Sequence, residues 1–257
     1  MGRHVRLEKR GHVAIMTLDD PESLNALDQG TFSKLAELWR DLDDDPEIRA
    51  IVVTGAGRGF CSGARMSSLQ DSAAKGQESD ELPAFTARQL GVWKPVITAV
   101  NGVCAGAGLH FVADADIVIA SDRASFVDTH VNVGQVSALE PIGLARRMPL
   151  GAVLRMVILG RNERLDAQEA LRLHMVSEVV AHKRLIDRAV ELAEMAAQGS
   201  PATVRTSLKA IWESLDKGLD EALHDGWNQI KHHRTHPDAI EGPLAFVEKR
   251  EPKWTIG

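Results

Sequence analysis

The sequence predicts an α/β fold that is followed by a helical C-terminal region. Over the first half of the chain, short apolar runs alternate with glycine-rich turns, as expected where buried strands are linked by crossover segments. From about residue 144 onward, apolar residues recur at helical spacing instead. Gly199-Ser200-Pro201 separates the two parts. We therefore expect a core over residues 1–195 and a helical region over residues 196–257.

The chain begins with a predicted hairpin and a predicted amphipathic helix. Residues 4–18 contain two alternating runs around Gly11, which is typical of a β-hairpin. Residues 29–43 predict the helix, and Asp44-Asp45-Pro46 ends it. The apolar residues at helical spacing are Phe32, Leu35, Leu38, Trp39 and Leu42.

Buried strands and glycine-rich turns are expected next. Continuous apolar runs predict strands at 49–54, 96–100, 115–121 and 123–127. The glycine-rich turns lie just after the first two strands, at residues 55–66 and 101–108. Residues 70–82 are polar and predict a mobile surface loop, while residues 84–93 predict a helix. Later helices are expected over 144–160, 165–174, 183–198 and 202–216, and within 219–250.

Composition and charge argue against several classes of protein. The 257 residues include 30 Lys and Arg against 36 Asp and Glu, and the net charge of −6 argues against a nucleic-acid partner. The apolar runs are shorter than the roughly 18 residues of a membrane span, and the charged N-terminus lacks a signal-peptide pattern. Cys61 and Cys104 cannot form a disulfide framework. These features predict a cytoplasmic protein with reduced thiols and no membrane partner.

Three motifs suggest chemistry that their surroundings disfavour. Gly55, Gly57 and Gly59 follow a strand but miss the spacing of a dinucleotide-binding turn. Residues 59–63 resemble a nucleophile elbow centred on Cys61, yet loop residues separate them from the preceding strand. A cluster of histidines lies on a polar helical face without other ligand residues, so no metal site is predicted there. The cluster consists of His232, His233 and His236.

The two glycine-rich turns allow a further interpretation. The sequences FCSGA (60–64) and NGVCAGAG (101–108) belong to turns that follow buried strands. Side by side, each turn could present one free backbone N–H to the same oxygen atom, which is the arrangement of an oxyanion hole. From composition alone, an oxyanion hole and two ordinary tight turns are equally good interpretations.

Six motifs, in order along the chain, decide between these interpretations. They are residues 21–28 (PESLNALD), 49–64, 94–109, 115–120, 159–177 and 246–252. Together they resemble the crotonase, or enoyl-CoA hydratase/isomerase, superfamily over nearly the whole chain. The resemblance implies a crotonase-like spiral of ββα turns and an acyl-CoA substrate. It also implies a helical C-terminal region that assembles homotrimers or homohexamers.

The resemblance assigns binding roles by position. It implies that the N–H groups of Ala64 and Ala107 stabilise a thioester enolate. It also implies contacts with CoA by Ser62, Arg65, Met66, Ala26, Leu27 and Lys249. Relatives usually carry aspartate at the position of Arg65, which could place a cation near the CoA phosphates. CoA belongs to the substrate, and no separate cofactor is implied.

Histidine occupies both positions where hydratases of this family carry catalytic glutamates. The two residues are His110 and, twenty residues later, His130. Because imidazole can act as acid and base near neutral pH, the paired change favours retained acid/base chemistry over a scaffold that only binds acyl-CoA. Glu140 could reach the acyl pocket and orient a histidine or the substrate, or it could be a helix N-terminal carboxylate. Ala138 stands where dehalogenating relatives carry a nucleophilic aspartate, which disfavours that chemistry.

The predicted function is an enoyl-CoA hydratase-type lyase. The thioester oxygen is expected at Ala64 and Ala107, and a water molecule between His110 and His130. The alternatives are an acyl-CoA isomerase, a hydrolase of C–C or thioester bonds with the same oxyanion hole, and a non-catalytic acyl-CoA-binding protein. A histidine-driven enzyme should change its rate steeply between about pH 5.5 and 7.5.

Overall fold

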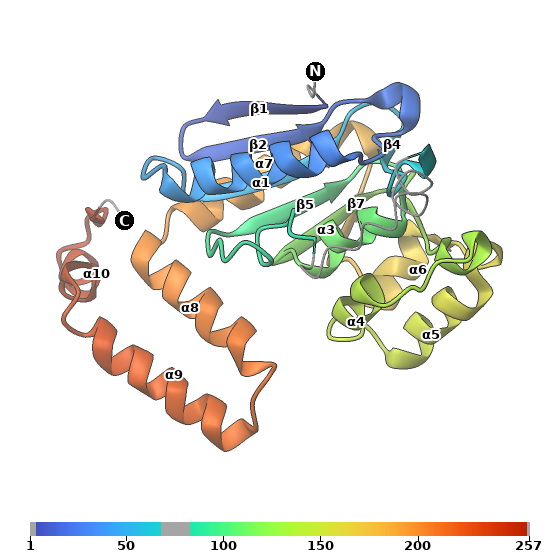
Figure 1. The fold of residues 1–257 in the computed structure, drawn as a ribbon. Coiled ribbons are helices and arrows are strands. Elements are labelled where there is room, and N and C mark those ends of the chain that lie inside the picture. The colour runs from blue at the N-terminus through green and yellow to red at the C-terminus, as the bar shows by residue number, and fades with distance from the viewer. Residues whose placement is uncertain (1–3, 68–82, 256–257) are drawn as a thin grey trace.

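Two β-sheets form the centre of the computed structural model, which describes residues 4–67 and 83–255 (Figure 1). The larger sheet has the strand order β1-β2-β3-β5-β7-β10, and the smaller sheet has the order β4-β6-β8-β9. The larger sheet consists of β1 (Val5–Arg10), β2 (Val13–Leu18), β3 (Ala50–Gly55), β5 (Val96–Val100), β7 (Ile117–Ser121) and β10 (Glu178–Val180). The smaller sheet consists of β4 (Gly59–Cys61), β6 (Val103–Ala105), β8 (Ser125–Val127) and β9 (Leu165–Asp166).

Successive strand pairs contribute one strand to each sheet. β3, β5 and β7 are parallel neighbours in the larger sheet. The strands that directly follow them, β4, β6 and β8, are parallel neighbours in the smaller sheet. This repeat confirms the predicted α/β fold class with its spiral of ββα turns. The predicted N-terminal hairpin is also confirmed, since β1 and β2 pair antiparallel around Gly11.

Helices cover the sheets and form the C-terminal region. The helices before residue 200 include α1 (Gln29–Asp44), α3 (His110–Ala113), α4 (Leu139–Leu144), α5 (Leu150–Leu159), α6 (Ala167–Arg172) and α7 (Leu185–Ala197). Those after it are α8 (Pro201–Ser214), α9 (Leu219–His233) and α10 (Pro237–Glu248). Asp28 caps α1 by accepting a hydrogen bond from the Thr31 N–H, and Ser200 caps α8 in the same way through Thr203.

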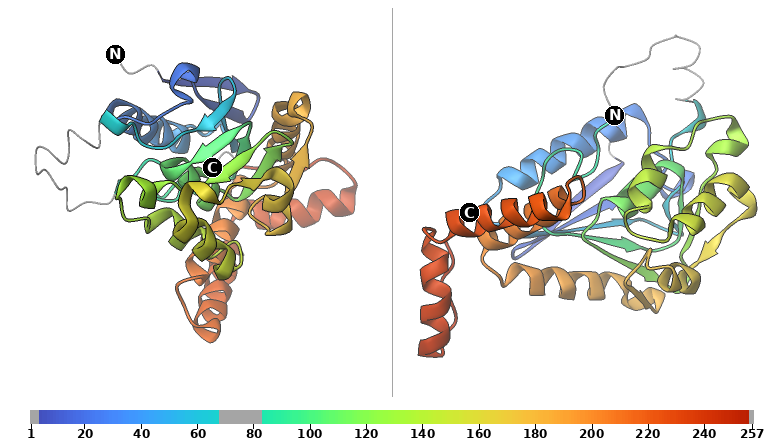
Figure 2. Two further views of the ribbon diagram at one scale, coloured as in Figure 1. Left: turned by 90° about the vertical axis from the view of Figure 1, so that its right-hand side faces the viewer. Right: turned by 90° about the horizontal axis from the view of Figure 1, so that it is seen from below.

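The larger sheet lies between α1 and α7, as the view from below in Figure 2 shows. Ile51 and Val53 of β3 pack in the cluster that contains the buried face of α1. Ala50 and Val52 point the other way and pack with α7. Because side chains alternate along a strand, a continuous apolar run such as 49–54 is the pattern expected for a strand covered on both faces.

Residues 84–93 form turns, so the helix predicted there is wrong. The Gln89 Oε1 atom accepts hydrogen bonds from the N–H groups of Phe85 and Thr86, at 3.0 and 3.2 Å. The Arg88 guanidinium donates to the carbonyls of Val92 and Lys94. These bonds from side chain to main chain compete with the helical ladder.

The helix predicted over 144–160 begins too early, because residues 145–149 lie between two helices. α4 ends at Leu144 and α5 begins at Leu150, directly after Pro149. Proline lacks an N–H and disfavours the helical conformation of the residue before it, so the helix breaks there. The sequence likewise did not predict β4, β6, β9 and β10, which have only two or three residues each. The loop predicted over 70–82 lies outside the described residues.

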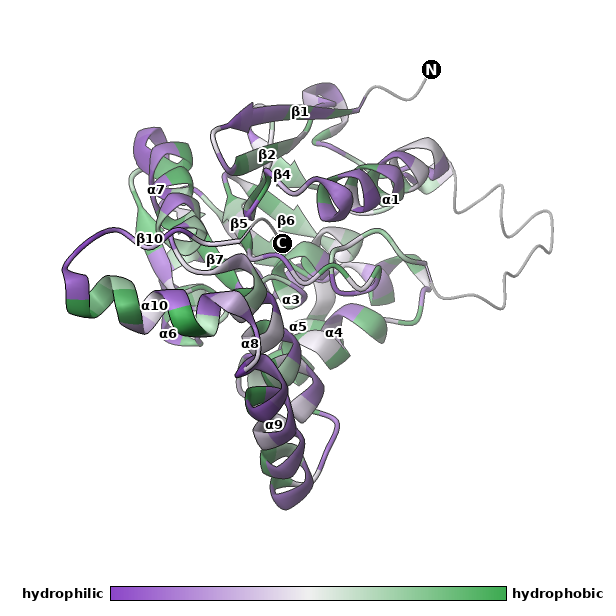
Figure 3. Ribbon diagram, turned by 90° about the vertical axis from the view of Figure 1, so that its left-hand side faces the viewer, coloured by the Kyte–Doolittle hydropathy of each residue, from purple (hydrophilic) through white to green (hydrophobic). Residues whose placement is uncertain are grey.

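The C-terminal helices α9 and α10 extend away from the sheets (Figure 1). Figure 3 shows apolar residues on both helices. The exposed ones include Leu223, Trp227 and Ile230 on α9, and Ile240 and Phe246 on α10. Such a face suits contact with another chain. None of the helices within residues 4–67 and 83–255 has the length and apolar character that a membrane crossing needs.

Candidate active site

The two glycine-rich turns lie directly against each other. Gly63 and Gly106 both have positive φ angles, +94° and +50°, which favour glycine. A Cβ atom on Gly63 would lie 3.0 Å from the carbonyl oxygen of Ala105 and 3.4 Å from the backbone nitrogen of Ala107. A side chain at this position would be strained by its φ angle, and the facing turn would have to shift to make room for it.

The N–H groups that follow these glycines are available for a ligand. Within residues 4–67 and 83–255, the N–H of Ala64 donates no backbone hydrogen bond. Ala107 is the second residue of the 3-10 turn Gly106–Leu109, so its N–H precedes the first one that can bond within the turn. The arrangement thus offers two neighbouring main-chain donors, as an oxyanion hole requires.

Two asparagines that the sequence did not single out hold the turns in place. Asn25, itself at φ +60°, donates its side-chain amide to the carbonyls of Gly59 and Phe60, at 2.9 and 3.1 Å. Asn101 donates to the carbonyls of Gly57 and Gly59, at 3.0 and 3.1 Å. Asparagine can satisfy several carbonyls through its side-chain amide. The available signal was the place of Asn101 at the start of the second glycine-rich turn, and Asn25 had no such signal.

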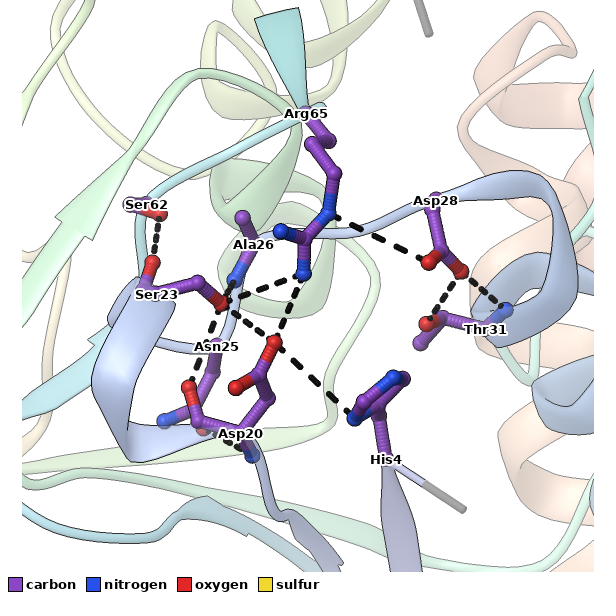
Figure 4. Close-up of polar contacts among 9 residues, drawn as sticks. All are labelled: His4, Asp20, Ser23, Asn25, Ala26, Asp28, Thr31, Ser62 and Arg65. Carbon is purple, nitrogen blue, oxygen red and sulfur yellow. Dashed lines mark hydrogen bonds and ion pairs between the residues drawn. The ribbon is translucent and has the colours of Figure 1, made fainter. Parts of the chain in front are cut away.

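Two of the predicted CoA-contacting residues, Ala26 and Ser62, both form hydrogen bonds with Ser23 beside the first turn (Figure 4). Leu27 forms a short parallel bridge with Ala64, in which the Leu27 N–H donates to the Gly63 carbonyl at 2.8 Å. The Ser62 hydroxyl donates to the carbonyl of Ser23 at 2.9 Å. The segment before α1 therefore supports the loop that carries the Ala64 N–H.

Arg65 is engaged within the protein. Its guanidinium donates to Asp20 Oδ2 at 2.7 Å, and its Nε atom lies 3.9 Å from Asp28 Oδ2 (Figure 4). A hydrogen bond from Ser23 and the Arg65 guanidinium outweigh burial and lower the pKa of Asp20. Arg65, which was expected to bring a positive charge near the CoA phosphates, is thus paired with two carboxylates.

Met66 lies two residues after Ala64, whereas Lys249 lies in the C-terminal region, away from the first turn. Met66 is 51% exposed. Lys249 caps the C-terminal end of α10. Figure 1 shows α10 at the opposite end of the molecule from α4 and α5.

Three segments bring two histidines and a glutamate together. His110 begins α3, His130 begins the 3-10 turn His130–Val133, and Glu140 lies in the first turn of α4. Glu140 Oε1 lies 3.4 Å from His110 Nε2 and 3.8 Å from His130 Nε2. Glu140 therefore has both features considered from the sequence, a place at a helix N-terminus and an orientation toward the histidines.

The cluster of His110, His130 and Glu140 lies beside the two glycine-rich turns. A Cβ atom on Gly106 would lie 3.6 Å from His130 Cε1. Gly106 precedes Ala107 in the second turn, and His110 follows that turn directly. The main-chain donors and the imidazole rings can therefore act on the same small ligand.

Asp128 fixes the orientation of His130. Its Oδ1 atom lies 2.9 Å from His130 Nδ1, and its Oδ2 atom accepts a hydrogen bond from the Ser137 hydroxyl. Burial of Asp128 opposes its charge, but these hydrogen bonds outweigh burial and lower its pKa. The same contact with Asp128 is the main reason why the pKa of His130 is raised.

His110 lies in a drier environment than His130. It is only 5% exposed, and its ring meets the Phe85 ring edge-to-face at a centroid distance of 5.1 Å. Burial lowers the pKa of His110, although Glu140 and Asp114 oppose this effect. Gln89, which the sequence analysis did not identify, lies 3.3 Å from His110 Nδ1. The two histidines thus have pKa values displaced in opposite directions.

The other motifs of the sequence have structural roles. Cys61 is fully buried, and burial raises the pKa of its thiol to about 12, which disfavours a thiolate nucleophile. The rings of His233 and His236 stack at 5.0 Å, and the His236 side chain caps α10. Among the described residues, no three histidine, cysteine or acidic side chains are placed to hold a metal ion together.

Comparison with known proteins identifies the family of the chain. The family model described as enoyl-CoA hydratase/isomerase matches residues 8–256. The chain is 35% identical to (E)-benzylidenesuccinyl-CoA hydratase from Thauera aromatica, over 96% of this chain and 97% of that protein. It is also 35% identical to carnitinyl-CoA dehydratase from Proteus mirabilis, over 99% of both chains.

A solved structure extends the comparison to the fold. An enoyl-CoA hydratase/isomerase from Mycobacterium paratuberculosis superposes with a TM-score of 0.90 at 38% identity, over 100% of both chains. The family model, the relatives and this structure all match nearly the whole chain, and they lead to one conclusion. The chain belongs to the enoyl-CoA hydratase/isomerase family of enzymes.

Proposed function

We propose that this enzyme adds water to the double bond of an enoyl-CoA thioester, or removes it in the reverse direction. The observation that carries the proposal is the convergence of His110 and His130 on Glu140, beside two main-chain donors. The names of two relatives at 35% identity, a hydratase and a dehydratase, are consistent with this reaction class.

The two main-chain donors stabilise the charge that develops on the thioester oxygen. When water attacks the β-carbon of the enoyl group, electron density moves through the double bond to the carbonyl oxygen. The N–H groups of Ala64 and Ala107 then bind an enolate oxygen. A single preorganised donor of this kind contributes about 3–4 kcal/mol to transition-state stabilisation.

The cluster of His110, His130 and Glu140 holds the reacting water and moves its proton. The water oxygen forms a bond to the β-carbon while an imidazole accepts one water proton. The enolate then collapses, the α-carbon receives a proton, and the product is the β-hydroxyacyl thioester. Atoms and electrons balance without an oxidant or reductant, and CoA enters only as part of the substrate.

The remaining contacts and the assembly follow from the same proposal. Ala26, Leu27, Ser62, Arg65 and Met66 border the side of the first turn where we place CoA. The exposed apolar residues of α9 and α10 support a homotrimer or homohexamer.

The test is a steady-state assay with a panel of enoyl-CoA thioesters at pH 5 to 9, followed at the absorbance of the conjugated enone. Loss of that absorbance, accompanied by formation of the β-hydroxyacyl thioester, is the expected result. Saturable binding of every thioester without turnover would contradict hydration and favour a binding protein. Release of free CoA without hydration would favour a thioester hydrolase.

A further inference from the structure

The side-chain amide of Gln89 has only one orientation that satisfies its neighbours. One end of the amide accepts hydrogen bonds from the backbone N–H groups of Phe85 and Thr86, at 3.0 and 3.2 Å. An NH₂ group cannot accept these bonds, so this end is the oxygen atom Oε1. The NH₂ group is therefore the end that lies 3.3 Å from His110 Nδ1.

This orientation determines the tautomer of His110. Because Gln89 presents a donor, the Nδ1 atom must be the acceptor and carries no proton. The proton of the neutral ring then lies on Nε2, which is 3.4 Å from the Glu140 carboxylate. In neutral His110, Nδ1 is thus the hydrogen-bond acceptor and Nε2 is the donor.

His130 has the opposite tautomer. Its Nδ1 atom lies 2.9 Å from the Asp128 carboxylate, which can only accept a hydrogen bond when ionised, so Nδ1 carries the proton. The Nε2 atom of neutral His130 therefore has a free lone pair. This atom lies on the side of the ring that faces Glu140, at 3.8 Å.

We propose that Gln89 is a positioning residue that fixes His110 as a neutral Nε2–H donor and thereby leaves His130 Nε2 as the atom that accepts and returns the proton. This role of Gln89 rests on the proposed hydration and gives the two histidines different tasks. His110 orients the water or Glu140, while His130 takes the water proton and delivers it to the α-carbon.

The charges around each ring are consistent with this division. His110 faces Glu140 from α4 and Asp114 from its own helix, and it also lies near His130. The Asp114 carboxylate is held by the Thr86 hydroxyl at 2.5 Å, in the same turn as Gln89. A second proton on His110 would have to sit on Nδ1 and meet the Gln89 NH₂ group. His130 faces Asp128 and Glu140, which both favour its protonated form.

The tautomers can be read in the full-length protein without substrate. Nitrogen NMR of protein labelled at histidine distinguishes an Nδ1–H from an Nε2–H imidazole and detects the doubly protonated ring. We expect His110 as the Nε2–H tautomer and His130 as the Nδ1–H tautomer, with His130 gaining its second proton at higher pH than His110. Variants His110→Gln and His130→Gln assign the signals.

Two variants of Gln89 test its role directly. Gln89→Glu replaces the donor with a carboxylate that can accept a hydrogen bond from Nδ1–H, so His110 should gain a second proton at higher pH than in the parent protein. Gln89→Met keeps the approximate volume and removes the donor at Nδ1, so the fraction of His110 with its proton on Nδ1 should rise, although Glu140 still favours Nε2–H. Gln198→Glu adds the same charge at an exposed site after α7 and should leave both histidine signals unchanged.

The result that would overturn the inference is a neutral His110 with its proton on Nδ1, or a His110 signal that Gln89→Glu does not change. Thermal unfolding of each variant shows whether the fold is retained. If Gln89→Glu fails to fold, the same nitrogen NMR measurement is made on Gln89→Met. Because the readout is the resting protein, its failure is distinguishable from a failure of the proposed hydration, which appears only in the turnover assay.

Discussion

The two glycine-rich turns form the main-chain half of the candidate site, and the cluster of His110, His130 and Glu140 forms its side-chain half. The two halves lie side by side, but they are built from different parts of the chain. The turns offer main-chain N–H groups, and their geometry depends on glycines with positive φ angles and on the amides of Asn25 and Asn101. The cluster offers side chains from three separate segments. In the proposed reaction, the main-chain half can therefore keep one task, binding a thioester oxygen, while substitutions in the other half change the proton chemistry.

The largest effect is expected from disturbing the main-chain half at Gly63. In Gly63→Ala, the new Cβ atom would lie 3.0 Å from the Ala105 carbonyl at a φ angle of +94°, so the turn must move and carry the Ala64 N–H away. We expect kcat to fall by about 10²- to 10³-fold, the effect of losing one oxyanion donor.

A matched glycine controls for backbone strain. Gly11 also has a positive φ angle, +55°, but a Cβ atom there would meet nothing within 4 Å. Gly11→Ala should cost roughly 1–2 kcal/mol in the free energy of unfolding and leave kcat unchanged. Equal kcat values for the Gly63 and Gly11 variants would show that the turn does not bind the reacting oxygen.

The next prediction compares the two histidines through the same substitution. Glutamine can replace the Nε2–H donor of His110, but it cannot accept and return a proton as His130 does. We expect His130→Gln to lower kcat by about 10²- to 10⁴-fold, the range for general acid–base catalysis, and His110→Gln to lower it less. Steady-state kinetics measure both, with the exposed His224→Gln as a control. A larger loss of kcat in His110→Gln than in His130→Gln would contradict these roles and make His110 the group that transfers the proton.

A smaller effect, seen in the pH profile, is expected from Asp128→Asn. Neutral His130 is the form that accepts a proton, so kcat/KM should fall as pH drops below the pKa of His130. The amide oxygen of the introduced asparagine can still accept the Nδ1–H bond, but the charge that raises the pKa of His130 is gone. The profile should therefore shift to lower pH.

The measurement for Asp128→Asn is kcat/KM between pH 5 and 9, with the exposed Asp220→Asn as the charge-matched control. A profile that keeps its midpoint would mean that His130 does not control the rate. A shift to higher pH would be the wrong sign for a group whose raised pKa depends on a carboxylate.

The same contrast explains how much the sequence could predict. The hairpin around Gly11, the helix over 29–43 and the buried strands were predictable because periodicity and turn chemistry are local. The proposed oxyanion-hole positions came from the resemblance to a known family, not from local patterns. In contrast, the turns at 84–93 depend on hydrogen bonds from Gln89 and Arg88 to the main chain, which residue periodicity does not reveal.

The side-chain half was predictable only in part, for a physical reason. The positions of His110 and His130 could be inferred from the chain, but their shared contact with Glu140 depends on how α3 and α4 pack. The role inferred for Gln89 depends on a turn that was predicted as a helix. Long-range side-chain contacts of this kind arise from tertiary packing, which local sequence patterns do not specify.

The smallest effect on kinetics is expected from substitution of Arg65. This residue lies on the side of the first glycine-rich turn where we place CoA. Its guanidinium is paired with Asp20 at 2.7 Å and is 36% exposed, so it should contribute little to binding of the CoA phosphates. A partly exposed ion pair is worth about 1 kcal/mol or less, and Arg65→Gln should therefore raise KM by less than about 5-fold and leave kcat unchanged. The exposed Arg123→Gln serves as the control for loss of one positive charge. A much larger rise in KM that weakens at high salt would mean that Arg65 leaves Asp20 to bind phosphate, because such an attraction is screened by ions.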